Sequence, residues 1–392
     1  MFSQIFAVTG VNLKSIPQRW GSALIIVVGL AGVVAVFTAL LAMGEGFSST
    51  LAASGRKDAA LIMRGGSGAE LNSGLSRDEV NLIKLAPNIR KGKDGKPLAS
   101  GEILVISELY KKGETRNGSN ISVRGVEAPG FELRPTLRIV EGRMFKPGLR
   151  ELLVGRGVVQ QFEGVDVGKT LRMRGSEWTV VGVFESGDAY ESELWADAET
   201  AQNSFGRNGY SSVLAGVDGE KGVPALQAAL KADPRLNTDA LTQQQYFSDQ
   251  TKQFRLTIGV LATFITGVMA LGAIFAALNT MYAAVATRSK EIATLRALGF
   301  GGFPVLVSVM IEALVLSLIG GLIGAVIAYV LFNNLSVSTL GANFTQVVFA
   351  FKVTPLLVAA GLVIAVTVGF IGGLLPSIRA ARMPVTTALR AE

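Results

Sequence analysis

The sequence predicts a membrane protein with four transmembrane helices, all α in its membrane part, and an extracytoplasmic α+β domain inserted between spans 1 and 2. Hydrophobic residues make up 49% of the chain and charged residues 17%. The apolar residues gather in four runs, 21–43, 256–286, 303–332 and 354–376, each long enough to cross a bilayer. The block between the first two runs mixes charges, turn residues and short β-type segments, which is typical of an α+β domain.

The chain is expected to begin with an interfacial helix. Residues 1–19 form an amphipathic pattern that is broken at Pro17. The run that follows is longer than the apolar core of a secretory signal, so we expect an anchor that is not cleaved. The later segments are predicted in this order: transmembrane helix 1 (20–46), extracytoplasmic core domain with an inserted lobe (47–253), transmembrane helix 2 (254–287), short cytoplasmic helix (288–300), transmembrane helix 3 (301–333), extracytoplasmic loop (334–353), transmembrane helix 4 (354–376) and cytoplasmic tail (377–392).

Basic residues predict the orientation. Four spans place both termini on one side of the membrane. Most basic residues that flank the spans fall on that side, which is therefore cytoplasmic. Lys252 and Arg255 fall on the other side, but a long translocated domain largely escapes the charge rule. The cytoplasmic set is Lys14, Arg19, Arg288, Lys290, Arg296, Arg379, Arg382 and Arg390.

The inserted block contains several candidate elements. Two polar, turn-rich stretches, 91–101 and 111–120, bracket a strand-like run and are expected to be the exposed tips of an inserted hairpin or subdomain. The candidate strands are 60–64, 121–126, 151–154 and 177–184, and the candidate helices are 77–85, 223–230 and a helix that leads into the membrane from about Thr242.

The composition argues against an enzyme. The chain has no cysteine and no histidine, so it lacks a thiolate nucleophile, a zinc–thiolate site and the usual general base near neutral pH. The stretch GVDVGKT (164–170) has three residues where a phosphate-binding loop needs four, and a strand pattern follows it, so Gly168 is interpreted as a turn glycine. We assign no catalytic, cofactor-binding or metal-binding residue. The acidic loop around Glu185–Glu193 is interpreted as solvated rather than as a calcium site.

The net charge of +7 does not indicate nucleic acid, because many basic residues flank apolar runs, where they set orientation and contact anionic lipid.

Small residues recur every fourth position in three spans, which predicts close helix packing within or between protomers. The positions are Gly320, Gly324 and Ala328; Gly361, Ala365, Gly369 and Gly373; and Ala31, Ala35 and Ala39. Glu312 is the one acid well inside a span. It could be a functional gate, but we favour an acid near the cytoplasmic end that is hydrogen-bonded to a neighbouring helix.

The segment 288–300, RSKEIATLRALGF, is charged and helical in pattern. Ile292, Leu295 and Leu298 recur at spacings of three and predict one apolar face. Arg288, Glu291 and Arg296 are among the charged residues that place the segment outside the bilayer. The pattern alone leaves two interpretations open: a basic stop that fixes topology, or a surface that docks a partner.

This segment also belongs to a longer run that resembles a known family. The run NTMYAAVATRSKEIATLRALGF (279–300), which begins at Asn279, resembles the signature that closes the second span of permeases of the MacB and FtsX type. The C-terminal stretch 376–392, with its two prolines and its Ala-Leu-Arg, resembles the end of these permeases. Four stretches of the inserted block, 125–131, 141–145, 151–162 and 177–186, resemble their extracytoplasmic core domain. Asn279 and Glu312 are the intramembrane polar residues that the resemblance singles out.

The resemblance implies the permease subunit of an ABC transporter in the inner (cytoplasmic) membrane of a bacterial cell. The ATPase domain that is fused to MacB itself is absent, so ATP and Mg would be bound by two copies of a separate ATPase subunit. The permease would pair with itself or with a paralogue and pass ATP-driven motion to its periplasmic domain for export or extraction of a substrate. Substrates of efflux and of lipoprotein export fit equally well.

The resemblance also implies further partners and one alternative. A periplasmic adaptor, an outer-membrane channel or a cell-wall hydrolase would be a candidate partner. As the alternative, an FtsX-like regulator would control a periplasmic or cell-wall protein without transporting anything. In either case the segment 288–300 would be the coupling helix, which docks its apolar face into a groove of the ATPase, with Arg288 and Glu291 setting the register by charge.

Overall fold

The computed structural model describes residues 2–15, 17, 20–114, 116–341 and 344–384. The described chain divides into two compact units. The helical unit comprises residues 1–45, 256–335 and 351–392, and the α/β unit comprises residues 46–255 and 336–350.

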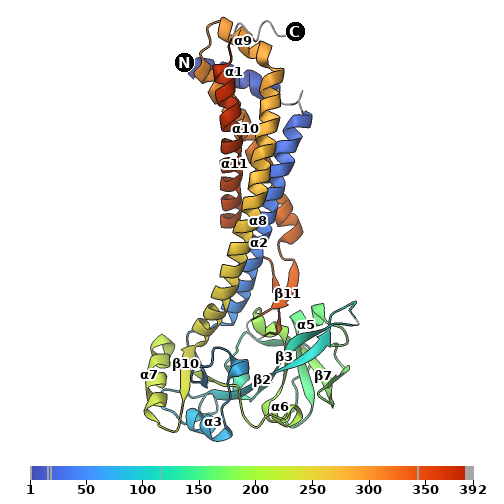
Figure 1. The fold of residues 1–392 in the computed structure, drawn as a ribbon. Helices are drawn as coiled ribbons and strands as arrows, with labels where there is room; N and C mark the ends of the chain where they lie inside the picture. Colours follow the sequence, from blue (N-terminus) through green and yellow to red (C-terminus); the bar gives the residue numbers. More distant parts are fainter. Residues whose placement is uncertain (1, 16, 18–19, 115, 342–343, 385–392) are drawn as a thin grey trace. The chain divides into compact units, whose positions relative to one another are not determined.

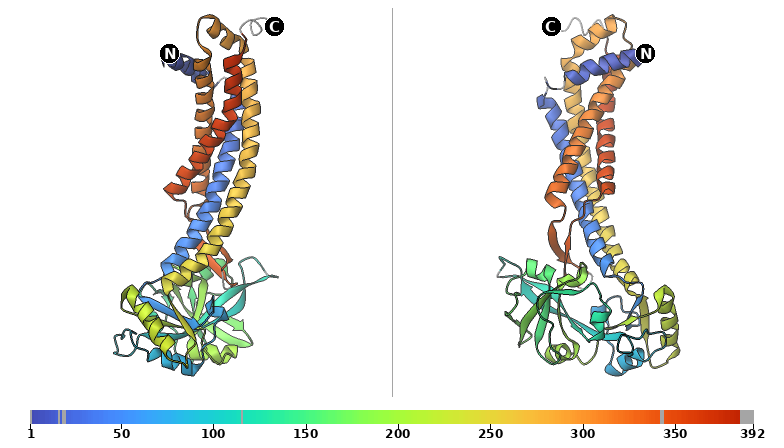
Figure 2. Two further views of the ribbon diagram at one scale, coloured as in Figure 1. Left: turned by 60° about the vertical axis from the view of Figure 1, so that its left-hand side comes forward. Right: turned by 180° about the vertical axis from the view of Figure 1, so that it is seen from behind.

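The helical unit is built from the apolar runs of the sequence (Figure 1). Four described helices are long and apolar enough to cross a membrane. In the two views of Figure 2, α10 and α11 lie side by side along the bundle. The helices with residues in this unit are α1 (Phe2–Lys14), α2 (Trp20–Ser54), α8 (Gln243–Thr287), α9 (Ser289–Ala297), α10 (Gly302–Phe332) and α11 (Pro355–Arg382).

Three spanning helices extend past the segments that the sequence predicted. Helix α2 continues to Ser54 rather than ending near residue 46, and α11 continues to Arg382. Helix α8 begins at Gln243, ahead of the span expected from 254, and agrees with the helix expected to lead into the membrane from about Thr242. The prediction was based on hydrophobic length, whereas a helix satisfies its own backbone hydrogen bonds and has no need to end where the hydrocarbon ends. Helices α2 and α8 therefore each contribute residues to both units.

A mixed sheet forms the centre of the α/β unit. In the described part of the chain its strands run in the order β10-β1-β9-β2-β3-β8-β5-β7-β4, and β6 also pairs with β7. Most neighbours are antiparallel, but β3 pairs with β8, and β5 with β7, in parallel. The strands are β1 (Ala59–Arg64), β2 (Ala99–Tyr110), β3 (Gly118–Val126), β4 (Arg138–Gly142), β5 (Glu151–Gly155), β6 (Thr170–Met173), β7 (Ser176–Glu185), β8 (Glu193–Asp197), β9 (Ser212–Gly216) and β10 (Thr238–Thr242).

Short helices cover this sheet and divide its core in two. One core lies around β1, β9 and β10 under α3 and α7, and the other around β3, β5, β7 and β8 under α5 and α6. Strand β2 joins them, because its first residues pair with β9 and its later residues with β3. The helices are η2 (Glu70–Asn72), α3 (Arg77–Lys84), α4 (Pro129–Glu132), α5 (Arg156–Gln161), η3 (Ala189–Ser192), α6 (Ala198–Phe205) and α7 (Gly219–Ala232).

Local signals explain several element boundaries. Ser76 and Glu79 form a reciprocal capping box at the start of α3. Helix α6 is capped by Asp197 and ends at Gly206, whose φ of 63° favours glycine. Gly168 has a φ of +85°, and strand β6 follows it. A strand rather than a helix therefore follows this turn, whereas a phosphate-binding loop is followed by a helix N-terminus.

The segment 334–353, predicted as an extracytoplasmic loop, contains a β-hairpin. Strands β11 (Ser336–Leu340) and β12 (Gln346–Ala350) pair in register, and both belong to the α/β unit. Backbone and side-chain contacts to that unit hold the hairpin: Ser192 accepts from the Val348 N–H at 2.8 Å, and Ser122 donates to Thr345 at 2.9 Å. The sequence did not predict these two strands, because they are short and lie between two spans, where polar residues suggested only a connection.

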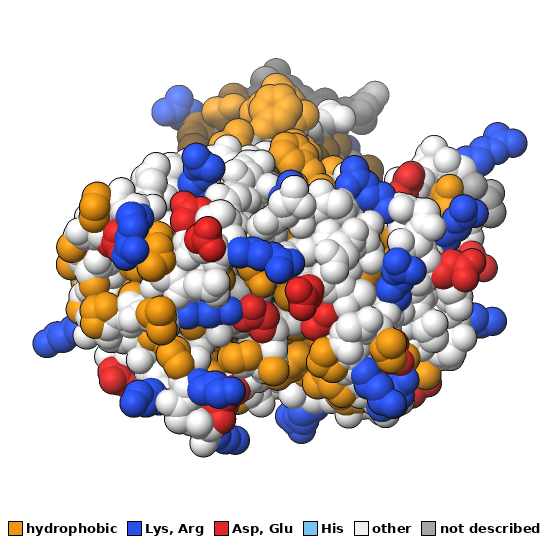
Figure 3. Space-filling view, turned by 90° about the horizontal axis from the view of Figure 1, so that it is seen from below, with side chains coloured by type: hydrophobic (Ala, Val, Ile, Leu, Met, Phe, Trp, Pro, Cys, Tyr) orange, Lys and Arg blue, Asp and Glu red, His pale blue; other side chains and the backbone are white. Residues whose placement is uncertain are grey.

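On the face shown in Figure 3, the surface of the α/β unit has no large patch of side chains of one charge. Lysine and arginine side chains alternate there with aspartate, glutamate and apolar groups. That mixture is typical of a soluble domain.

Candidate functional site

The short helix α9 lies between two spanning helices. It begins after Arg288, which occupies the N-cap position, and the chain turns at Gly299, whose φ is +94°. A positive φ at this point favours glycine, which explains the Leu-Gly-Phe at the end of the segment. Helix α10 starts directly afterwards at Gly302.

Arg288 points into the helical unit rather than away from it. Its Nη1 donates to Glu312 Oε2 of α10 at 3.0 Å, and the side chains are 8% and 7% exposed. A buried carboxylate with a hydrogen-bonded guanidinium partner avoids the penalty of an isolated charge. The favoured interpretation of Glu312, an acid hydrogen-bonded to a neighbouring segment, therefore agrees with the structure. The expected role of Arg288 at the edge of a docking face does not, because its guanidinium is used internally.

The same guanidinium also holds the N-terminal helix α1. Its Nη2 donates to the carbonyl oxygen of Asn12 at 3.4 Å and to the hydroxyl of Ser15. The Asn12 amide in turn donates to Ser308 of α10. Helices α1, α9 and α10 are thus joined around one buried ion pair.

The apolar stripe of α9 does not lie on one face. Ile292 is 6% exposed and belongs to the core of the helical unit, whereas Leu298 is 73% exposed. Leu295 is intermediate and lines a cavity. A spacing of three falls short of the 3.6-residue helical turn, so each step rotates the side chain away from the last. The predicted single apolar face is corrected to an inward residue, Ile292, and an outward one, Leu298.

The outer side of α9 combines one apolar and several polar side chains. Glu291 is 72% exposed and lies 3.9 Å from Arg288 Nε. Arg296 donates from Nη1 to the carbonyl oxygen of Met383 at 2.6 Å, which ties α9 to the end of the chain. Lys290 and Thr294 of α9 are exposed, as is its C-cap residue Leu298.

A cavity of about 340 Å³ lies beside the ion pair. Side chains of α1, α8, α9 and α10 line it, including Val8, Val285, Leu295, Val309 and Glu312. Most of this lining is apolar.

The predicted packing glycines lie where helices approach each other within one chain. A Cβ at Gly320 would come within 2.8 Å of the Val27 carbonyl oxygen of α2, and one at Gly373 within 2.6 Å of Ala313 Cβ of α10. Gly324 and Gly361 also abut α2, and Gly369 abuts Ser317 of α10. The side chain of Asn279 of α8 is exposed.

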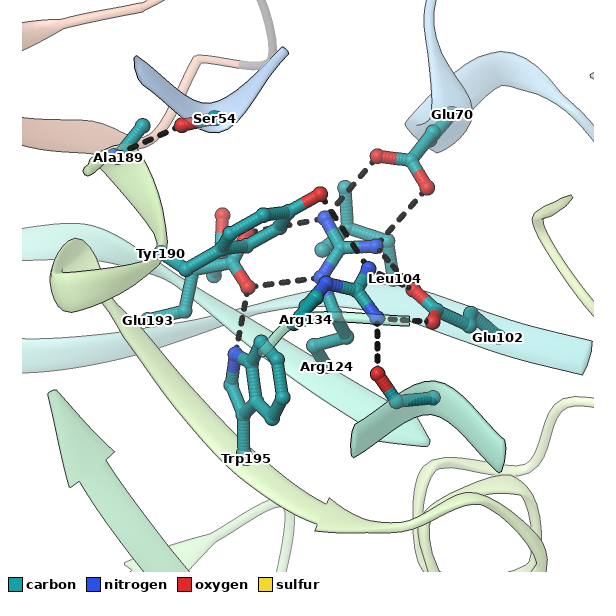
Figure 4. Close-up of polar contacts among 12 residues, drawn as sticks. Ser54, Glu70, Glu102, Leu104, Arg124, Arg134, Ala189, Tyr190, Glu193 and Trp195 are labelled. Carbon is teal, nitrogen blue, oxygen red and sulfur yellow. Dashed lines mark hydrogen bonds and ion pairs between the residues drawn. The ribbon is translucent and has the colours of Figure 1, made fainter. Parts of the chain in front are cut away.

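Sequence reasoning missed a buried charge network in the α/β unit (Figure 4). Arg124 of β3 donates to Glu70 at 2.9 and 3.0 Å, to Glu102 at 2.9 Å, and to Glu193 at 2.7 and 2.9 Å. Arg134 donates to both oxygens of Glu102, at 2.6 and 2.8 Å. The signal was a lone charge inside an apolar strand pattern, Arg124 in ISVRGV and Glu102 in ASGEILV.

The electrostatics of this network follow from its burial. Burial alone would raise the pKa of Glu70, but the charge and hydrogen bonds of Arg124 outweigh it and hold the pKa below its ordinary value. Burial would likewise lower the pKa of Arg124, yet Glu193 and Glu70 raise it well above its usual value. Burial raises the pKa of Tyr190 to about 12, so its phenol stays protonated beside Arg134.

The carboxylates of this network, Glu70, Glu102 and Glu193, all have hydrogen-bond donors. The three carboxylates already accept from guanidinium, hydroxyl or indole donors. Within the described residues, no cluster of acidic side chains suits a metal ion.

Comparisons with known proteins give a consistent pattern. Residues 21–233 match the MacB-like periplasmic core domain, and residues 263–385 match the FtsX-like permease C-terminal domain. The chain is 23% identical over 409 aligned residues to an uncharacterized ABC transporter permease, YvrN, from Bacillus subtilis (strain 168), covering 97% of this chain and 96% of that protein.

Two solved structures of extracytoplasmic domains are also similar. The extracellular domain of the noncanonic ABC-type transporter YknZ from Gram-positive bacteria is 16% identical, with a TM-score of 0.37, and aligns over 47% of this chain and 100% of its own. The periplasmic region of MacB from Actinobacillus actinomycetemcomitans is 14% identical, with a TM-score of 0.37, over 48% of this chain and 90% of its own.

Proposed function

Because the chain belongs to the ABC transporter permeases of the MacB and FtsX type, we propose that it is the permease subunit that carries ATP-driven motion from a separate ATPase to its α/β unit. Two ATPase copies supply bound ATP and Mg, and two permease chains assemble with them. The motion serves to export or extract a substrate. The chain itself performs no catalysis.

The observation that carries this proposal is the construction of α9. The helix is joined to α10 and α1 by the buried Arg288–Glu312 pair, while Leu298 stays 73% exposed. A short helix with an exposed apolar residue and a rigid internal attachment suits docking in a groove of a partner. A push on α9 then reaches α10 through the ion pair instead of being absorbed by a flexible loop.

The orientation of the chain is part of the proposal. We place both termini and α9 in the cytoplasm, and the α/β unit outside the cytoplasmic (inner) membrane of a bacterium, because basic residues gather near α9 and the end of α11. The absence of native cysteine allows a direct test. A cysteine at Thr294 should react with an impermeant maleimide only after the cytoplasmic side is opened, and one at Asn117 should react in intact cells.

The docking role is tested with Leu298→Asp in the full chain, co-expressed with its ABC ATPase and purified in nanodiscs. A carboxylate at the centre of an apolar contact should reduce ATPase recovery about tenfold or more. The control is Leu85→Asp, which alters an equally exposed leucine (78%) of the α/β unit. Equal ATPase recovery and ATP turnover for both variants would contradict docking through α9.

A further inference from the structure

Three stretches of chain connect the α/β unit to the helical unit: the end of α2, the start of α8, and the β11–β12 hairpin, which lies between α10 and α11. Every spanning helix is therefore adjacent in sequence to one of these connections. Within the α/β unit, all three contact the same short helix, η3 (Ala189–Ser192).

The end of α2 contacts the first residue of η3. The Ala189 N–H donates to the Ser54 hydroxyl at 2.9 Å, and Ser54 is 3% exposed (Figure 4). Because Ser54 is the last residue of α2, this bond joins the end of the helix directly to η3.

The start of α8 contacts the second residue. Gln243, the first residue of α8, donates from Nε2 to Tyr190 Oη at 2.7 Å and is 2% exposed. One turn later, the ring of Phe247 meets the Tyr190 ring edge-on, with centroids 6.0 Å apart. The Gln243 side chain also accepts from the N–H of Arg56, two residues after the end of α2, at 3.2 Å.

The hairpin contacts the last residue. Ser192 accepts from the Val348 N–H at 2.8 Å and donates to the Val348 carbonyl at 3.5 Å. A Cβ on Gly157 would lie 3.0 Å from the Glu191 carbonyl oxygen and 3.1 Å from Val348 Cβ, so η3, α5 and β12 meet without spare space.

Helix η3 is also bonded to the buried charge network. Tyr190 Oη accepts from Arg134 Nη2 at 3.3 Å, and the Arg134 guanidinium lies 4.4 Å from the Tyr190 ring centroid. Strand β8 begins immediately after η3 with Glu193, which pairs with Arg124 of β3. A displacement of η3 is thus passed to the centre of the sheet.

We propose that η3 is the anchor at which motion of the spanning helices enters the α/β unit, with Tyr190 and Ser192 as its positioning residues. The inference rests on the proposed function for the source of the motion. It adds that all three connections meet at one helical turn, beside the further bonds that the hairpin makes with Ser122 and α8 makes with Glu70.

The test compares two double variants of the full chain in nanodiscs. Tyr190→Phe with Ser192→Ala removes two hydroxyls, the one bonded to Gln243 of α8 and the one bonded to Val348 of β12. The matched control, Tyr210→Phe with Ser211→Ala, removes a phenol bonded to Glu127 at 3.3 Å and a buried hydroxyl bonded to the Leu104 backbone at 2.9 and 3.3 Å. The control groups hold no residue of α2, α8 or the hairpin among the described contacts.

The first measurement is amide hydrogen exchange without nucleotide. Residues 243–254 and β12 should exchange about tenfold faster in the first variant than in the control, as lost hydrogen bonds permit local opening. Strand β7 should keep its protection in both variants. Equal protection of 243–254 and β12 in the two variants would overturn the anchor.

The second measurement adds the co-expressed ATPase and MgATP with vanadate. Spin labels at Glu163→Cys and Lys231→Cys report the distance between the two cores of the α/β unit. The nucleotide-dependent distance change should vanish in the Tyr190/Ser192 variant and persist in the control. Both variants should keep their ATP turnover. A change that persists in the Tyr190/Ser192 variant would refute transmission through η3. A different outcome would refute the proposed function and leave the anchor in place: faster amide exchange in the Tyr190/Ser192 variant, together with no nucleotide-dependent distance change in the unmodified chain.

Discussion

Replacing Glu102 with glutamine should destabilise the α/β unit strongly. Glu102 is 0% exposed and accepts three bonds, two from Arg134 and one from Arg124. Arg124 keeps Glu70 and Glu193 as partners, but Glu102 is the carboxylate paired with Arg134 in the described chain. Removing one partner of a buried pair costs about 3–5 kcal/mol. For a domain of this size each kcal/mol lowers Tm by about 2–4 °C, so we expect a fall of about 6–20 °C.

The assay follows tryptophan emission of the full chain during heating. Trp178 and Trp195 are both fully buried in the α/β unit, and the Trp195 indole donates to Glu193 within the network, so their emission reports this unit. Glu199→Gln serves as the control, because its pair with Arg77 is 3.5 Å long and both side chains are more than half exposed. Such a surface pair contributes about 0–1 kcal/mol. A Tm for Glu102→Gln within about 2 °C of the control would refute the stabilising role of the network.

Two further predictions concern other parts of the chain. Gly324→Leu should force α10 away from α2, since a Cβ there would lie 3.0 Å from Ala31 Cα. The change should destabilise the helical unit by about 1–3 kcal/mol or prevent its folding. The control Gly29→Leu, where a Cβ meets nothing within 4 Å, should be tolerated, and equal yields of monodisperse protein for the two variants would contradict the packing. Because the pKa of Glu70 is lowered by folding, its stabilising contribution is complete above its ordinary value of 4.5 and is lost as the pH falls through the folded pKa. Glu70→Gln should therefore flatten the acid part of a curve of stability against pH, and parallel curves below pH 4.5 would show that this carboxylate does not contribute.

The spans and many strands were predictable from the sequence, because lipid requires long apolar runs and strands carry β-branched and aromatic residues. The strands expected at 60–64 and 151–154 agree with β1 and β5 to within a residue. The helix expected at 77–85 agrees with α3, whose capping signal is local. Each of these signals lies within a few neighbouring residues.

The two sites depended on distant contacts, and the sequence did not show them. Arg288 and Glu312 face each other across 24 positions, and Arg288 reaches Ser15 across 273. Glu70 and Glu193 meet at Arg124, although they lie on either side of it in the chain. A local pattern reveals that a charge sits in an apolar strand, but its partner depends on sheet topology.

The hairpin β11–β12 makes the α/β unit discontinuous in sequence. A soluble piece cut at residues 46 and 255 would lose the strand that bonds Ser192 and the Thr345 hydroxyl that receives the bond from Ser122. It would also expose the surface that Val348 and Phe349 cover in the full chain, where these two side chains are 8% and 3% exposed. Expression of the isolated domain should therefore succeed best when residues 336–350 are joined to it by a linker. Insertions or deletions between α10 and α11 should change the stability of the domain, because they fall in its own strands rather than in a free loop.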